Sequence, residues 1–314
     1  MYAISTDRLT RDFASVRAVD NLTLEVPFGT VFGFLGPNGA GKTTTIRLLL
    51  GLLEPTSGTA AVLGRDIQSQ ADEIRERCGA LLEYNGLYER MSAEDNLEFY
   101  GRVWKLSPAE RKNRAEELLK HFGLWDRRKD LARDWSRGMK QKLAIARTLL
   151  HKPELVFLDE PTAGLDPVAA VSLREDLAGL AGMNRTTIFL NTHNLGEAEK
   201  LCNQVGVIRK GKLVAVGSVE ELRSSSGKPQ ATISGSNFSE LGLSMIRQNP
   251  DVAGVTLNGK QLTIELKRPI DVAPLVSQLV ANGAMIEEVR KGQASLEDVF
   301  LTLMNEEQEL EVES

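Results

Sequence analysis

The chain has 314 residues, of which 42% are apolar and 26% charged, so it is long enough for two globular domains with sizeable cores. A net charge of −5 gives no electrostatic reason to expect nucleic-acid binding. Its two cysteines, Cys78 and Cys202, lie too far apart in the sequence for a disulfide framework or a zinc cluster. No apolar run approaches the roughly 20 residues of a membrane-spanning helix, and residues 1–8 do not have the pattern of a signal peptide. We therefore expect any membrane role to come through a partner.

A strand, a glycine-rich loop and a helix are predicted to follow one another between residues 31 and 53. Residues 31–35 form an apolar β run, residues 44–53 form a leucine-rich helical segment, and the loop between them fits the P-loop pattern GxxxxGK[ST]. Glycines let backbone N–H groups approach phosphate oxygens, Lys42 can reach the β- and γ-phosphates, and Thr43 can offer its hydroxyl to Mg²⁺. This context outweighs the alternative of a plain glycine-rich turn. It predicts a nucleoside triphosphate site at Gly36, Pro37, Asn38, Gly39, Ala40, Gly41, Lys42, Thr43 and Thr44.

Helical periodicity dominates the segment from about residue 92 to residue 152. Ser92 and Asp95 have the spacing of a capping box at a helix start, and apolar residues then recur every three or four positions. Near the end of the segment, Ser136 and Gly138 precede an amphipathic helix. A helix N-terminus with a serine hydroxyl and unpaired N–H groups is a second site suited to phosphate.

A further predicted site lies about 117 residues beyond Lys42, at the end of an apolar strand. Residues 155–158 form an apolar β run that ends in Asp159 and Glu160, which is the Walker B arrangement. The strand would place Asp159 beside Mg²⁺. Because side chains alternate along a strand, Glu160 must use the turn before Pro161 to face the nucleotide. There its carboxylate could polarise the water that attacks the γ-phosphate. The matched P-loop disfavours the alternative of a strand that ends in solvated acids.

These motifs, taken in order, resemble those of the ATP-binding cassette (ABC) family, whose signature is commonly written LSGGQ. Ser136 and Gly138 match that signature, while the residues around them depart from it: Trp135, Arg137 and Met139. The resemblance covers residues 1 to about 222. It implies an α/β P-loop ATPase cassette with a RecA-like core, an antiparallel β subdomain and a helical subdomain at about residues 84–152. ATP and Mg²⁺ are the implied cofactors.

The resemblance also assigns roles outside the P-loop and Walker B segments. Residues 163–166 look like the D-loop, and His193, after the β run 186–190, looks like the switch histidine that contacts the γ-phosphate. Phe13 occupies the place of the aromatic residue that stacks on adenine, although a plain core or surface role is the alternative. The family usually has a glutamine where this chain has Glu83, whose carboxylate can approach Mg²⁺ but cannot donate a hydrogen bond when ionised. The implied catalytic residues are Glu160 and His193, and the implied metal ligands are Thr43, Glu83 and Asp159.

A second, smaller module is predicted beyond a linker at residues 223–229. Residues 230–305 have the order strand, helix, two strands, helix and strand, with a hairpin signal at Asn258-Gly259. This order predicts a small α+β, ferredoxin-like domain. A last helix is expected at about residues 296–308, and residues 306–314 form an acidic tail. The end of the module resembles the C-terminal extension of drug-resistance-type ATPases of the ABC-2 transporter group. We favour an interaction or dimer-bracing role for it over a ligand sensor.

The resemblance implies the nucleotide-binding subunit of an ABC transporter. Two cassettes, in a homodimer or a heterodimer, would meet head to tail, with ATP between Lys42 of one chain and Ser136 of the other. The surface around residues 83–91 would contact an integral-membrane permease, so the chain would be cytoplasmic and peripheral on the cytoplasmic face of the membrane. Export is the commoner direction in this group, and no nucleic-acid partner is expected.

Two alternatives remain open at this point. A cassette ATPase of DNA repair or translation would be favoured by coiled-coil insertions, tandem cassettes or a basic arm, none of which we find in the sequence. A P-loop kinase or GTPase would leave the segment around Ser136 unexplained, and a GTPase would be expected to show an NKxD-type guanine-reading loop, which we do not find.

Overall fold

The computed structural model describes residues 2–184, 186–226, 229–292 and 295–301. It divides into two compact units, Met1–Val216 and Gly217–Ser314, which are described separately below. Among the described residues, none of the helices combines the length and the apolar character needed to cross a membrane.

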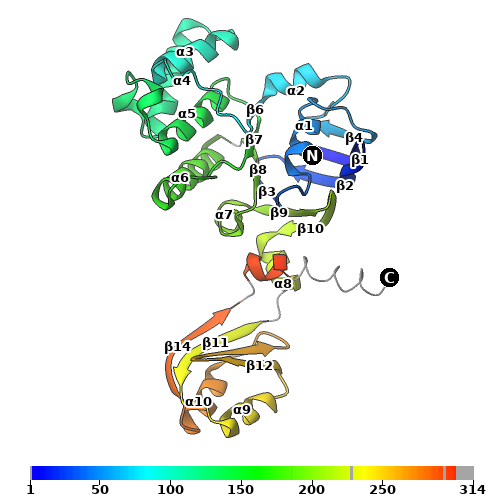
Figure 1. Ribbon diagram of the computed structural model, residues 1–314, viewed down its shortest axis with the longest axis vertical. Helices are drawn as coiled ribbons and strands as arrows, with labels where there is room; N and C mark the ends of the chain where they lie inside the picture. The colour runs from blue at the N-terminus through cyan, green and yellow to red at the C-terminus, as the bar shows by residue number, and fades with distance from the viewer. Residues whose placement is uncertain (1, 185, 227–228, 293–294, 302–314) are drawn as a thin grey trace. The chain divides into compact units, whose positions relative to one another are not determined.

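A six-stranded sheet forms the centre of the first unit (Figure 1). Its strand order is β10-β9-β3-β8-β7-β6, with parallel pairing from β9 through β6. Every residue of β3, β7 and β8 is buried, as expected for parallel strands that are covered on both faces. The carboxyl ends of these three neighbours meet at one edge, where open α/β sheets bind their ligands. The strand bounds are β3 Val31–Leu35, β6 Cys78–Leu81, β7 Leu155–Asp159, β8 Thr187–Thr192, β9 Gln204–Arg209 and β10 Lys212–Ser218.

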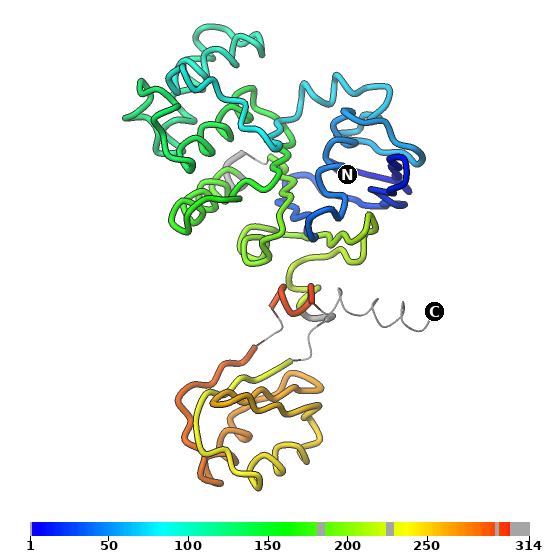
Figure 2. Tube along the Cα trace, viewed as in Figure 1, coloured from blue at the N-terminus to red at the C-terminus, as the bar shows by residue number. Residues whose placement is uncertain are grey.

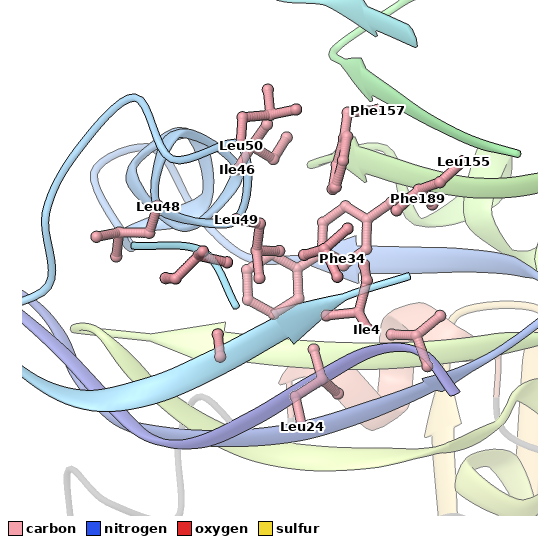
Figure 3. Packing of buried hydrophobic residues seen from close by; sticks show 14 of the residues in the cluster. Ile4, Leu24, Phe34, Ile46, Leu48, Leu49, Leu50, Leu155, Phe157 and Phe189 are labelled. Atoms are coloured by element: carbon pink, nitrogen blue, oxygen red, sulfur yellow. The ribbon is translucent and has the colours of Figure 1, made fainter. Parts of the chain in front are cut away.

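A smaller sheet with antiparallel pairing lies beside the first helix. Its order is β2-β1-β4-β5, and its strands are β1 Tyr2–Phe13, β2 Val16–Pro27, β4 Ser57–Val62 and β5 Arg65–Asp66. Side chains from this sheet, from helix α1 (Lys42–Leu49) and from the central sheet fill one apolar core (Figure 3). Phe34 of β3 packs against Phe189 of β8 with ring centroids 5.4 Å apart. This core holds α1 against both sheets and thereby fixes the loop that precedes it.

Helix α1 is shorter than the sequence pattern predicted. It begins at Lys42 and ends at Leu49, whereas helical residues were expected as far as Leu53. Gly51, with φ of 61°, lies in the left-handed region just past the helix end. The N–H groups of Gly51 and Leu52 donate to the carbonyls of Leu48 and Arg47, at 2.9 and 2.8 Å. This is a Schellman motif, and the left-handed glycine at its centre is the usual stop signal of such a helix.

Three helices make up most of the predicted helical segment, which Figure 2 shows as a separate lobe of the first unit. They are α3 Ala93–Val103, α4 Pro108–His121 and α5 Arg137–Leu149. Ser92 caps α3 as predicted, because its hydroxyl accepts a hydrogen bond from the Asp95 N–H at 3.1 Å. Leu97, Leu118 and Leu143 lie in the core of this lobe. Three further helices of the first unit are α2 Ala71–Arg77, α6 Pro167–Asn184 and α7 Leu195–Leu201.

The second unit has the predicted βαββαβ order, which confirms the ferredoxin-like prediction. Its sheet has the order β12-β13-β11-β14, and all three pairings are antiparallel. The Asn258-Gly259 turn joins β12 to β13, and Gly259 has φ of 60°. Helices α9 and α10 contribute Leu243 and Leu279 to a core beneath the sheet. The bounds are β11 Gln230–Ser236, α9 Glu240–Arg247, β12 Val252–Asn258, β13 Gln261–Leu266, α10 Ala273–Ala281 and β14 Met285–Gly292.

Two expectations about the ends of this unit need comment. Helix α8, Val219–Ser226, occupies the first part of the segment 223–229 that the sequence predicted to be a linker. Ser295 caps a last helix that begins at Leu296, as predicted, and its hydroxyl accepts the Asp298 N–H at 3.1 Å. The described part of this helix ends at Leu301, so the rest of the helix and the acidic tail at 306–314 lie outside the described residues.

Candidate functional site

The loop between β3 and α1 passes so close to neighbouring backbone that it admits no side chain at two of its glycines. A Cβ atom at Gly36 would lie 2.3 Å from the carbonyl oxygen of Ile208, and one at Gly41 would lie 2.2 Å from that of Ala18. Gly41 also has φ of 105°, in the region that favours glycine. The loop therefore keeps a tight course into the N-terminus of α1, where backbone N–H groups and the helix dipole favour an anion.

Lys42 is a buried cation at the start of α1. Its Nζ atom donates to the carbonyl oxygens of Gly36 at 2.7 Å and Pro37 at 3.2 Å, and lies 3.8 Å from Oε1 of Glu160. Burial lowers the pKa of Lys42, while the negative charges of Glu160 and Asp159 oppose that shift. An anionic ligand in the loop would supply further countercharge to this ammonium group.

Asp159, at the end of β7, receives two hydrogen bonds that fix its carboxylate. The Thr43 hydroxyl donates to Oδ2 at 2.7 Å, and the Asn191 amide donates to Oδ1. A hydroxyl and a carboxylate are hard oxygen ligands, and Mg²⁺ is commonly held by one or two such protein groups together with water and substrate phosphates. The donor set therefore fits Mg²⁺. Sequence reasoning missed Asn191, although a polar residue at the end of a wholly buried strand was an available signal.

Glu160 faces the same cleft as Asp159 because the backbone turns sharply between them. Glu160 has φ of 50°, and its N–H donates to the Asn191 carbonyl at 2.8 Å. Its Oε1 atom lies 2.8 Å from Nδ1 of His193, which follows β8. This left-handed turn is the route that the sequence predicted for bringing both carboxylates to one side. A left-handed residue with a side chain costs roughly 1–2 kcal/mol, which the hydrogen bonds around it offset.

Two clefts share Thr43, Asp159 and Glu160. One, of about 440 Å³, is lined by the glycine-rich loop and by residues 16–18 of β2. The other, of about 490 Å³, extends toward the helical lobe and is lined by Glu83, Asn85, Trp135, Arg137, Lys140 and Gln141, among others. The two carboxylates thus stand between a phosphate-binding loop and a second polar cavity.

Phe13, the predicted adenine contact, does not line the first cleft. Its ring lies at the end of β1, where the Arg11 guanidinium sits 4.6 Å from the ring centroid. Val16, the strand partner of Phe13, lines the cleft instead.

Ser136 and Gly138 lie at the start of α5. The Ser136 hydroxyl caps the helix by accepting the Met139 N–H at 3.3 Å, and its side chain is exposed. Gly138 is buried, and a Cβ there would lie 2.9 Å from that of Ala169. Within the described part of the chain, neither residue lines a cleft with Lys42. Trp135 and Arg137, which flank Ser136, line the second cleft together with Thr43 and Asp159.

Glu83 has a partner that the sequence did not reveal. Its Oε1 atom lies 3.1 Å from Nη2 of Arg47, on α1, and both side chains are partly exposed. Glu83 lines the second cleft with Thr43 and Asp159. The carboxylate is thus near the predicted metal ligands while it is paired to a cation on the helix that follows the P-loop.

Comparison with known proteins decides the family. The profile described as ABC transporter matches residues 19–163, and the profile described as ATP-binding protein DrrA1-3-like, C-terminal domain, matches residues 217–304. The daunorubicin/doxorubicin resistance ATP-binding protein DrrA of Streptomyces peucetius is 36% identical over 312 residues, which cover 96% of this chain and 92% of the relative. The chain belongs to the ABC transporter family. It is an ATP-binding subunit that hydrolyses ATP, and its cassette is followed by a DrrA-like C-terminal domain.

Further relatives agree with this ABC assignment. The Nod factor export ATP-binding protein I of Cupriavidus metallidurans is 39% identical over 290 residues, covering 92% of this chain and 93% of the relative. A solved structure titled "Structure of ATP binding subunit of ABC transporter" superposes with a TM-score of 0.64 at 30% identity, covering 71% of this chain and 92% of that one. Family membership excludes the P-loop kinase and GTPase alternatives. These relatives also give no support to a role in DNA repair or translation.

Proposed function

We propose that this ABC subunit powers export through a separate integral-membrane permease, from the cytoplasmic face of the membrane. The observation that carries the proposal is likeness along almost the whole chain, second unit included, to ATP-binding proteins named for drug resistance and for Nod factor export. The name of the Nod factor relative states export, and we infer the same direction for this chain. Which compound is carried is decided by residues of the permease.

The nucleotide site is completed by a second cassette, most simply another copy of this chain. Lys42 and Ser136 each stand at a helix N-terminus suited to phosphate. A head-to-tail pair would set Ser136 and Gly138 of one copy over the triphosphate held by Lys42 of the other. ATP then binds the closed pair more tightly than the open one, and this differential affinity supplies the conformational work.

In the proposed pair, one copy contributes Lys42 and the residues around it to each nucleotide site. Each of these residues has a role that its geometry supports. Lys42 would release the loop carbonyls and bind the β- and γ-phosphates, because a phosphate is a stronger partner than a carbonyl. Thr43 and Asp159 would hold Mg²⁺, which neutralises phosphate charge when bound. Glu160 would accept a proton from the attacking water as its oxygen bonds to the γ-phosphorus and the bond to the β-phosphate oxygen breaks. His193, 2.8 Å from Glu160, would contact the γ-phosphate and orient that carboxylate.

The permease would dock where the helical lobe meets the central sheet. A groove of about 380 Å³ lies there, lined by residues that include Tyr84, Trp104, Arg147 and His151. Tyr84 is 85% exposed, and it directly follows Glu83 of the second cleft. This continuity gives a short path by which nucleotide contacts at Glu83 would reach a membrane partner. The second unit, for which no catalytic role is proposed, would brace the dimer or the complex.

Affinity capture tests this proposal. The tagged chain, expressed in its native host, is purified from detergent-solubilised membranes with and without ATP, and its partners are identified by mass spectrometry. We expect a polytopic permease in near-stoichiometric amount, with the Tyr84→Ala and Trp104→Ala variants recovering less of it. Recovery of ribosomes or DNA-repair proteins in place of a permease would contradict the proposal.

A further inference from the structure

Glu197 is a fully buried carboxylate close to the Glu160–His193 pair. It lies on α7 (Figure 1), the helix that follows His193, and it is 0% exposed. Its Oε2 atom accepts two hydroxyl hydrogen bonds, from Thr162 at 3.0 Å and from Thr192 at 2.9 Å. These two threonines come from separate segments of the chain, so one carboxylate oxygen joins them.

Both threonines adjoin the pair that we place at the γ-phosphate. Thr162 is two residues beyond Glu160, and Thr192 directly precedes His193. The 2.8 Å contact between Glu160 and His193 and the two hydrogen bonds to Glu197 therefore close a ring of contacts. Within this ring, the Glu197 carboxylate adds a side-chain link between the turn after β7 and the end of β8, beside the hydrogen bond from the Glu160 N–H to the Asn191 carbonyl.

Further hydrogen bonds fix Glu197 itself. The Asn194 side chain caps α7 by accepting the Glu197 N–H at 3.1 Å, and the Thr192 hydroxyl accepts the Asn194 N–H at 3.0 Å. The backbone of Glu197 is thus held by the segment that carries His193, while its side chain reaches across to Thr162. The carboxylate spans from one catalytic segment to the other.

Burying a carboxylate at this position costs free energy. Burial raises the pKa of Glu197, an effect that the Glu160 charge adds to and that the two hydroxyls and the Arg174 charge oppose. Its second oxygen, Oε1, has no hydrogen-bond partner among the described residues. Apolar side chains of similar volume often replace buried charges without loss of stability. What an acid contributes here is an acceptor that two hydroxyls can share.

We propose that Glu197 is a positioning residue for hydrolysis: its buried carboxylate ties Thr162 to Thr192 and so holds Glu160 and His193 together for attack on the γ-phosphate. The inference rests on the roles proposed above for Glu160 and His193. Glu197 lies behind both residues and does not touch the nucleotide. Loosening this tie therefore slows the chemical step and leaves ATP binding intact, because Lys42 and Thr43 are outside the ring.

Three variants of the full-length chain test the inference. Glu197→Met removes the acceptor, Thr162→Val removes one donor, and Glu197→Gln keeps an acceptor oxygen while removing the charge. We expect kcat for ATP to fall about tenfold or more in the first two, since small misplacements of reacting groups can cost up to about 100-fold. KM should stay within about twofold, and Glu197→Gln should keep at least about a third of the wild-type kcat. Thr6→Val is the matched control, because that buried hydroxyl also donates to one group, the Leu22 carbonyl, and accepts from another, the Leu24 N–H.

A second measurement separates positioning from a loss of folding. Repeating Glu197→Met in a His193→Ala background should lower kcat by less than about twofold, because the pair that Glu197 holds together is already broken. Thermal unfolding and ATP affinity are measured alongside. Wild-type kcat in folded Glu197→Met, or equal and independent losses in both backgrounds, would overturn the inference.

A parallel assay of Glu160→Gln distinguishes failure of this inference from failure of the proposed function. If Glu160→Gln turns over normally, the proposed role of Glu160 fails, and this inference fails with it. If Glu160→Gln is inactive while Glu197→Met is normal, only the inference about Glu197 is overturned.

Discussion

Replacing Glu160 with glutamine should separate ATP binding from hydrolysis. The amide keeps the size of the side chain and an oxygen that can accept a hydrogen bond from His193, but it cannot take a proton from water at neutral pH. Loss of a general base costs about 10²–10⁴-fold in rate. The carboxylate also lies 3.8 Å from the Lys42 ammonium, an attraction of about 1 kcal/mol in water and about 4 kcal/mol at the dielectric of a partly buried pair. Removing it frees Lys42 for phosphate, so ATP affinity should hold or rise.

Single-turnover phosphate release and equilibrium ATP binding measure the two effects separately. We expect slow release, unchanged or tighter binding, and ATP-dependent dimers on size exclusion. Glu154→Gln serves as a control that removes one carboxylate from an ion pair with Arg77, outside the two nucleotide clefts. Phosphate release close to the wild-type rate in Glu160→Gln would refute the role given to this carboxylate.

Two further predictions concern Glu83 and His151. Glu83→Gln should retain at least partial ATPase activity in a steady-state assay, since an amide oxygen can approach Mg²⁺ as a carboxylate does; complete loss would show that the carboxylate itself is required. Burial lowers the pKa of His151 to about 4, from an ordinary value of 6.5, and its ring stacks on Trp104. The unfolded chain therefore takes up this proton at higher pH than the native chain, so the free energy of unfolding should fall between pH 6.5 and pH 4, by at most about 3 kcal/mol before screening. His151→Phe should weaken that fall in urea titrations at both pH values, and an identical pH dependence would contradict the assignment.

The sequence predicted the parts of the site that depend on local chemistry. The glycine-rich loop needs Gly36 and Gly41 for reasons of backbone contact, and the sharp turn at Glu160 follows from the alternation of side chains along a strand. The Asn258-Gly259 hairpin is likewise a local signal. Each of these features is decided within a few residues, where steric rules leave few options.

The partners of these residues could not be predicted in the same way. Asn191 reaches Asp159, Arg47 reaches Glu83, and Glu197 reaches Thr162 only because β8 lies between β3 and β7 in the sheet and because α1 and α7 pack near that edge. Strand order is a property of the whole unit. Ser136 shows a different limit, because Ser136 itself lines neither of the two clefts that contain Thr43 and Asp159.

The central claim is that two molecules share each nucleotide site. Mixing two inactive variants tests it most directly. Lys42→Ala removes the phosphate-binding half, and Ser136→Arg blocks the other half. Neither variant should hydrolyse ATP alone, whereas an equal mixture should recover about a quarter of wild-type activity, because half of randomly paired dimers carry one intact site of two. A mixture no more active than its parts, or a Ser136→Arg monomer that hydrolyses ATP at the wild-type rate, would contradict the account.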